Sequence, residues 1–228
     1  VLDAQRAAFR IEEASRVLLL YSTSFDASLS DIGTALLSGA ALCLEDANSV
    51  SRCGSILNLI QDRRISHADI PPSMLAVHVD DEAPDCLETI IIGGEVCSPE
   101  VVRSWAKQIR LINVYGPTEA TICTSLCECS PDWSRPLLGQ PLPEIEYRIV
   151  DNANRPVAVG QAGELLISGP CLARGYANCP DMTAHRFAVL DSQRFYRTGD
   201  RVRLDADGQY VFLGRLDRQL KVRGFRIE

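Results

Sequence analysis

Residues 89–119 read TIIIGGEVCSPEVVRSWAKQIRLINVYGPTE and hold a complete strand–helix–strand pattern. The apolar runs at 89–92 and 111–114 are each typical of a buried strand. Between them, the Ser-Pro pair at 98–99 is a helix start signal, and the apolar spacing extends that helix to about Gln108. Two buried strands joined by one helix predict parallel strands with a crossover connection.

The residues that precede this pattern show the same alternation. A helix is expected from Ser28, with Ser28-x-x-Asp31 as its capping box, to about Ser38. Apolar segments predict further strands, and amphipathic spacing predicts one further helix; the strands are Val17–Tyr21, Ala41–Leu44 and Ile65–Ile70, and the helix is Ile56–Asp62. The sequence therefore predicts an α/β fold with a parallel sheet and crossover helices.

Beyond about Leu137 the period of the apolar residues changes from 3.6 to 2, which favours strands without helices. The alternating segments are Glu144–Val150, Glu164–Ser168, Arg201–Leu204 and Gln209–Leu213. We therefore expect an α/β subdomain at 1–137, a β-rich, barrel-like subdomain at 138–214 and a final segment at 215–228.

Composition narrows the class of protein. The net charge of -7 includes no long run of either sign, which argues against nucleic-acid binding. The longest apolar stretches fall far short of the roughly 20 residues that cross a bilayer, so no membrane partner is expected. The nine cysteines are an odd number in a long chain, which indicates reduced thiols and a cytoplasmic location.

Polar and glycine-rich loops follow four of the predicted strands, at Phe25–Ser28, Asp69–Pro72, Gly93–Glu95 and Tyr115–Glu119. Ligands of open parallel sheets bind beyond the carboxyl ends of the strands. Paired glycines let backbone approach a planar ligand, an aromatic ring offers a stacking face, and a Thr-Glu pair suits phosphate and a hard cation. Together these loops predict a nucleotide site, although each loop taken alone is more typical of an ordinary turn.

Five motifs, in this order, resemble the core motifs of the adenylation domains of nonribosomal peptide synthetases, which belong to the adenylate-forming superfamily. They are FDAS at 25–28, NVYGPTE at 113–119, GELLISG at 163–169 with ARGY at 173–176, YRTGD at 196–200, and GRLDRQLKVRGFRIE at 214–228. The longest of these motifs are highly specific.

The resemblance implies an ATP-dependent ligase that activates an amino acid with ATP and Mg²⁺. The product would then be loaded as a thioester onto the phosphopantetheine of a carrier protein, with the carrier and condensation domains of the same synthetase as partners. The resemblance also implies a phosphate loop upstream of Val1 and a lysine beyond Glu228. We therefore expect a central fragment that is incomplete at its N-terminus, ends at the start of a C-terminal subdomain, and is inactive alone.

The resemblance assigns roles to individual residues. Thr118 and Glu119 would be catalytic, with Glu119 binding Mg²⁺, and Asp217 would be the hinge. The nucleotide would be bound by Gly93, Gly94, Glu95, Asn113, Tyr115, Gly116, Thr118, Asp200 and Arg215. The amino acid would be bound by Asp26, Ala27, Ser30, Asp69, Ile91, Gly93, Val114, Ile122 and Cys123.

Two aspartates stand out in the predicted amino-acid pocket. The resemblance commits Asp26 to the α-ammonium group. Asp69, among apolar neighbours, needs a hydrogen-bond donor, which favours an amide or cationic substrate, with glutamine ahead of ornithine or lysine. Alternatively, backbone amides near Pro71 satisfy Asp69, and the pocket takes a small aliphatic residue.

Two other functions stay open. An acyl-CoA or aryl-acid ligase of the same superfamily would share the fold but would not need Asp26. A non-catalytic remnant could keep the fold as a binding module.

Overall fold

In the computed structural model, the described residues are 1–217, 220–222 and 225–227. They form two compact units. The α/β unit comprises Leu2–Asn113 and Glu128–Ser134, and the β-rich unit comprises Val1, Val114–Cys127 and Arg135–Glu228. The boundaries expected at 137 and 214 stay a prediction, and residues 218–219, 223–224 and 228 of the last predicted motif lie outside the described residues.

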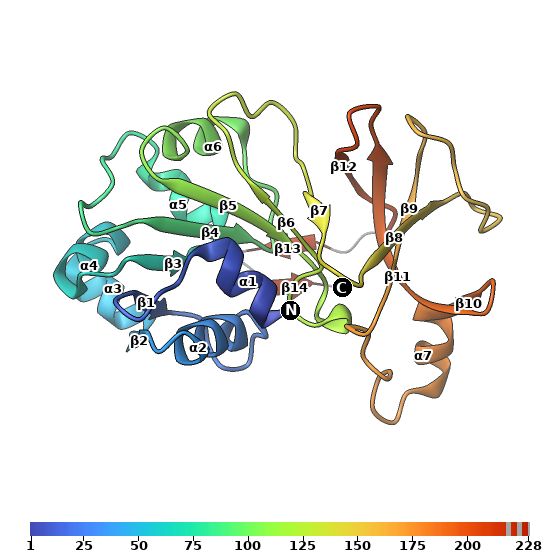
Figure 1. Cartoon of the computed structure of the whole chain (residues 1–228), viewed down its shortest axis with the longest axis horizontal. Coiled ribbons are helices and arrows are strands. Elements are labelled where there is room, and N and C mark those ends of the chain that lie inside the picture. The colour runs from blue at the N-terminus through green and yellow to red at the C-terminus, as the bar shows by residue number, and fades with distance from the viewer. Residues whose placement is uncertain (218–219, 223–224, 228) are drawn as a thin grey trace. The chain divides into compact units, whose positions relative to one another are not determined.

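The α/β unit is built on parallel strands, as predicted. Its strands are hydrogen-bonded in the order β2-β1-β3-β4-β5, and β5 continues into the β-rich unit (Figure 1). Their bounds are β1 Arg16–Leu19, β2 Ala41–Leu44, β3 His67–Asp69, β4 Thr89–Gly93 and β5 Arg110–Tyr115. The pairs β1–β2, β1–β3 and β3–β4 are parallel, so these strands end at one edge of the sheet.

Helices connect these strands, and apolar side chains pack between the two layers. The helices are α1 Leu2–Phe9, α2 Ala27–Leu37, α3 Ala47–Cys53, α4 Ile56–Arg63, α5 Pro72–Leu75, the 3₁₀ turn η1 Ala76–His78, and α6 Pro99–Trp105. Leu18, Ile90 and Trp105 are fully buried, which places the core between the sheet and its helices. No helix in the described ranges has the length and apolar character to cross a membrane.

The start of α2 differs from the prediction. The helix begins at Ala27, one residue early, and Asp26 at its N-cap position makes no side-chain capping bond. The Ser28 hydroxyl donates to the carbonyl oxygen of Phe25 at 2.6 Å. Asp31 is only 5% exposed, so it is buried among core residues of the unit. The predicted capping box was wrong because the helix starts one residue earlier, the Ser28 hydroxyl bonds to Phe25, and Asp31 is buried within the helix.

The β-rich unit is an antiparallel sheet in the order β10-β11-β9-β8, with β12 paired to β11. Its remaining elements are the 3₁₀ turn η2, the helix α7, the short β6–β7 pair and the antiparallel pair β13–β14. The bounds are η2 Thr118–Ala120, β6 Ser125–Glu128, β7 Gln140–Pro141, β8 Glu146–Val150, β9 Ala162–Ser168, α7 Pro180–Arg186, β10 Phe187–Leu190, β11 Gln193–Leu204, β12 Tyr210–Arg215, β13 Leu220–Val222 and β14 Phe225–Ile227.

Helix α6 depends on a side-chain cap. Ser98 accepts a hydrogen bond from the Val101 amide, and Pro99 occupies the first turn. We expect Ser98→Ala to lower the free energy of unfolding by about 1 kcal/mol, since an alanine leaves the amide without its acceptor. Urea unfolding of the purified protein measures this change. Ser24→Ala, at an exposed position, is the control; equal stability of the two variants would show that the cap contributes nothing.

Candidate functional site

The predicted amino-acid residues of the α/β unit lie where its strands end and α2 begins. Asp69 is the last residue of β3 and pairs in register with Ile91 of β4, and both are buried. Gly93 ends β4. Asp26, Ala27 and Ser30 form the first turn of α2 and the residue before it.

Asp26 carries an oxygen suited to a ligand. Its Oδ2 atom is shielded from solvent and has no hydrogen-bond partner within the described part of the chain. A buried carboxylate oxygen without a donor costs free energy until a donor reaches it. The ammonium group of a ligand would be such a donor.

Asp69 lies in an electrostatically unusual position. Burial raises its pKa to about 7, and a hydrogen bond from Tyr21 acts in the opposite direction. Asp31 is next to it: burial, and then the charge of Asp69, raise the pKa of Asp31 well above its ordinary value. Burial and then these two carboxylates also raise the pKa of Tyr21. Sequence reasoning missed Asp31 and Tyr21, although Asp31 follows Ala27 by four residues and so lies on the same side of α2.

The backbone of the loop after β4 is accessible. Gly94 has a φ of +76° with no other atom within 4 Å of an added Cβ, so the loop is accessible and requires glycine for its conformation. Glu95 accepts a hydrogen bond from the Ser73 amide through Oε2 at 3.3 Å. Asn113 is half-buried near the end of β5.

In the β-rich unit, three of the predicted nucleotide residues form one network. The Tyr115 hydroxyl donates to Oδ2 of Asp200, and Arg215 donates through Nη1 to Oδ1 of Asp200 at 2.8 Å. The Asp200 amide donates to the Thr198 hydroxyl at 2.9 Å. Burial, and then the charge of Asp200, raise the pKa of Tyr115, which keeps its hydroxyl protonated. The network holds the 7%-exposed Asp200 carboxylate in one orientation.

Arg215 also contacts the predicted hinge residue. Its Nε and Nη2 atoms donate to the two carboxylate oxygens of Asp217 at 2.9 and 2.6 Å. Arg186 of α7 lies 3.8 Å from the same carboxylate. Arg215 therefore links Asp200 to Asp217.

Glu119 lies in the 3₁₀ turn η2, next to Thr118, and is buried. The Tyr176 hydroxyl donates to its Oε1 atom at 2.5 Å, and the Ala173 amide donates to its carbonyl oxygen at 2.8 Å. Mg²⁺ is commonly held by one or two protein carboxylates together with water and substrate phosphates. One buried carboxylate fixed by a tyrosine hydroxyl therefore fits the predicted magnesium ligand.

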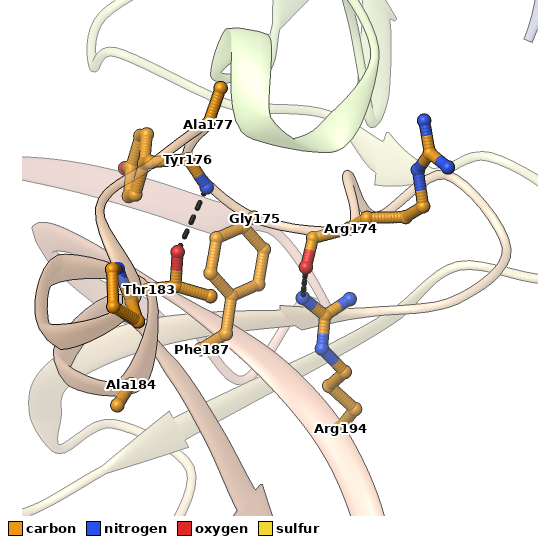
Figure 2. Close-up of a pocket in the computed structure, with 9 residues that line it drawn as sticks. Arg174, Gly175, Tyr176, Ala177, Thr183, Ala184, Phe187 and Arg194 are labelled. Carbon is orange, nitrogen blue, oxygen red and sulfur yellow. Dashed lines mark hydrogen bonds between the residues drawn. The ribbon is translucent and has the colours of Figure 1, made fainter.

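Tyr176 belongs to a short segment that packs against α7 (Figure 2). Its amide donates to the Thr183 hydroxyl at 2.9 Å. A Cβ on Gly175 would lie 2.5 Å from Thr183, so this close approach requires glycine. Arg194 also lines the pocket beside this segment, and it donates to the carbonyl oxygen of Arg174 at 2.9 Å, so this hydrogen bond holds the loop (Figure 2).

Gly116 brings the end of β5 against the other predicted pocket residues of this unit. A Cβ there would lie 2.5 Å from Cα of Cys123 and 2.8 Å from the carbonyl oxygen of Ile122. Ile122 has a φ of +69°, which is strained for a β-branched residue. Cys123 is fully buried, whereas Val114 is half-buried. Strain and close packing at one turn are typical of functional loops.

Each unit thus brings together its own share of the predicted residues. The α/β unit contains Asp26, Ala27, Ser30, Asp69, Ile91, Gly93, Gly94, Glu95 and Asn113; the β-rich unit contains Val114, Tyr115, Gly116, Thr118, Glu119, Ile122, Cys123, Asp200, Arg215 and Asp217. Their roles toward amino acid, nucleotide and metal stay predictions.

The chain resembles known proteins over nearly its whole length. The profile of a family described as AMP-binding enzyme matches residues 2–177. The chain is 43% identical over 232 residues to one of the linear gramicidin synthase proteins of Brevibacillus parabrevis, covering 100% of this chain and 4% of that protein. It is 39% identical to novobiocin biosynthesis protein H of Streptomyces niveus, covering 99% of this chain and 38% of that protein. The chain thus spans less than half the length of each of these relatives.

A solved structure shows the same fold. It is an artificially fused adenylation–PCP di-domain nonribosomal peptide synthetase from Klebsiella oxytoca, NpsA-ThdA, with a TM-score of 0.83, 27% identity, and coverage of 99% of this chain and 44% of that one. The fold is therefore that of adenylate-forming domains, as predicted. The chain belongs to the AMP-binding enzyme family.

The buried Asp69 predicts a pH effect on stability. Its folded pKa of about 7 lies above the unfolded value, so the folded state binds the proton more tightly and stability falls as the pH rises from about 4 to 7. The variant Asp69→Asn cannot bind this proton, so its free energy of unfolding should depend less on pH. The difference between pH 4 and pH 7 should shrink by up to about 4 kcal/mol. Urea unfolding at pH 4 and pH 8 measures it, with exposed Asp80→Asn as the control. Identical pH profiles for wild type and Asp69→Asn would contradict the expectation.

Proposed function

We infer that this chain is the central part of an adenylation domain of a nonribosomal peptide synthetase. The domain would activate an amino acid with ATP and transfer it to the phosphopantetheine thiol of a carrier domain, next to a condensation domain, in the cytoplasm. The observation that carries this proposal is the Asp200 carboxylate, held between Tyr115 and Arg215 although the three residues come from three separate motifs.

The first chemical step joins two anions. A carboxylate oxygen of the amino acid bonds to the α-phosphorus of ATP, and the bond from that phosphorus to pyrophosphate breaks. Catalysis of such a step consists mainly of positioning the reactants and neutralising charge. In the second step the thiolate sulfur of phosphopantetheine bonds to the acyl carbon, and AMP leaves.

The residues of the β-rich unit suit the nucleotide part of this chemistry. The fixed Asp200 carboxylate would accept hydrogen bonds from ribose hydroxyls, and Thr118 would donate to phosphate. Glu119 would hold Mg²⁺, which neutralises phosphate charge when it is bound. Tyr115 and Gly116 would border the base, and Asp217 would be the hinge for the second step.

The residues of the α/β unit suit recognition of the base and of the amino acid. The open backbone of Gly93 and Gly94, with Glu95 and Asn113, would contact adenine. Asp26, with its shielded oxygen, would bind the α-ammonium group. This assignment favours an amino acid over the fatty or aryl acids of related ligases, which have no ammonium group.

The decisive experiment compares residues 1–228 with the adenylation domain that includes its native flanking residues. We expect amino-acid-dependent exchange of pyrophosphate into ATP only with the flanks, because the phosphate loop and the lysine implied by the resemblance each stabilise developing charge by several kcal/mol. Strong exchange by residues 1–228 would contradict the assigned role of the flanks. No exchange by the flanked domain with any amino acid, but activity with fatty or aryl acids, would favour the related ligases.

Glu119→Ala in the flanked domain tests the metal assignment. We expect exchange to fall at least about a hundredfold, because no other group replaces a carboxylate as a hard ligand for Mg²⁺. Glu82→Ala, at an exposed position of the other unit, should leave exchange unchanged. Near-normal turnover of Glu119→Ala at millimolar Mg²⁺ would rule out the metal role.

A further inference from the structure

Two buried carboxylates lie close together in the α/β unit, and only one of them was predicted to contact substrate. Asp31 comes from the second turn of α2 and is 5% exposed, and Asp69 ends β3 and is 9% exposed. Tyr21 lies just after β1 and hydrogen-bonds to Asp69. The charge of Asp31 contributes to the raised pKa of Tyr21. The three side chains therefore form one cluster where β1 and β3 end.

The cluster lacks a positive charge. Among the described residues, neither Asp31 nor Asp69 forms an ion pair. The Oδ2 atom of Asp31 is shielded from solvent and has no hydrogen-bond partner in that part of the chain. The charged group that also acts on Tyr21, Glu95, is again acidic. Buried charges in proteins are normally paired, so this cluster is incomplete without a cation.

The alternative that backbone amides near Pro71 satisfy Asp69 is not supported. Among the described residues, Tyr21 is the hydrogen-bond partner that acts on the pKa of Asp69, and the Ile70 amide donates instead to the carbonyl oxygen of Ile91 at 2.9 Å. Asp69 thus keeps capacity to accept a further hydrogen bond.

Building on the proposed function, we propose that Asp31 and Asp69 together bind the side-chain ammonium group of a basic amino acid, such as ornithine or lysine. An ammonium group has three N–H donors, and the cluster offers three acceptors, one each from Asp31, Asp69 and Tyr21. Asp31 is then a specificity-determining residue for the amino acid. Asp26 stays available for the α-ammonium group.

An amide side chain suits the cluster less well. Like charges this close and this deeply buried retain a proton when the site is empty, because both carboxylates then resist ionisation. A bound ammonium group pairs with the ionised carboxylate while the proton stays on the other carboxylate, so the cluster then carries no net charge. A neutral amide leaves one negative charge unpaired, so the second carboxylate shifts preference from glutamine to the cationic side chains.

Substrate selectivity of the flanked wild-type domain is the first test. We expect kcat/KM in pyrophosphate exchange to be at least about tenfold higher for ornithine or lysine than for glutamine, leucine or phenylalanine, since an unpaired buried charge is costly. Preference for glutamine, leucine or phenylalanine would overturn this inference and leave the proposed function intact. No exchange with any amino acid would overturn the proposed function, and this inference with it.

Asp31→Asn tests the residue itself, because asparagine keeps the shape and removes the charge. We expect kcat/KM for the basic substrate to fall by roughly 10- to 100-fold, mainly through KM, with little change for glutamine. Asp62→Asn, at an exposed position of the same unit, should behave as wild type. An equal loss for ornithine and glutamine would mean that Asp31 is merely structural and would overturn its role.

The pH profile keeps the inference testable if Asp31→Asn does not fold. In the wild type, kcat/KM for ornithine should fall as the pH drops below about 7, the pKa of Asp69, because the protonated pair competes with the cation. The titratable groups that face one another here are Asp31 and Asp69; burial raises the pKa of the Tyr21 hydroxyl, so it stays protonated, and Glu95 is the other charged group that acts on Tyr21. A profile for ornithine that is flat from pH 6 to 8 would overturn the inference.

Discussion

Parallel pairing of β1, β3 and β4 determines where the polar groups of the α/β unit lie. Because the strands run in one direction, Tyr21, Asp69 and Gly93 all follow or end strands at the same edge. The apolar residues before them fill the core, and the first polar residue after each strand is the first that can reach a ligand. The candidate site residues therefore lie at strand ends and in loops, whereas the buried residues of the strands build the core.

In the β-rich unit, hydrogen bonds hold a carboxylate of low exposure in one orientation. Asp200 receives a hydrogen bond from Tyr115 and an ion pair from Arg215, so neither of its oxygens lacks a donor. Arg215 divides its donors between Asp200 and Asp217. A movement that pulls Asp217 away would leave Arg215 with fewer partners, which couples the predicted hinge to the predicted nucleotide residue Asp200.

Much of the fold could be predicted because the spacing of apolar residues along the chain follows which side chains are buried. The strands at 41–44 and 89–93 were predicted to within one residue. Helix α7 was missed because none of its residues is buried, so it has no apolar period. Only the last third of β11 was predicted, since its register against β9 shifts between Arg197 and Arg201 and hides the alternation.

The residues of the candidate site also fall into two groups, those that could be predicted from the sequence and those that could not. Motif residues such as Glu119 could be proposed from local sequence, because the chemistry that their side chains allow is visible in the motif. Asp31 could not be predicted in this way, since nothing in its local sequence distinguishes a helix-capping carboxylate from a buried one. Only tertiary packing places it beside Asp69, where burial and the neighbouring carboxylate raise its pKa and so make ionisation of the pair costly. A cluster that costs stability in the empty protein is more readily explained by ligand binding than by folding, because a bound cation removes the repulsion that packing created.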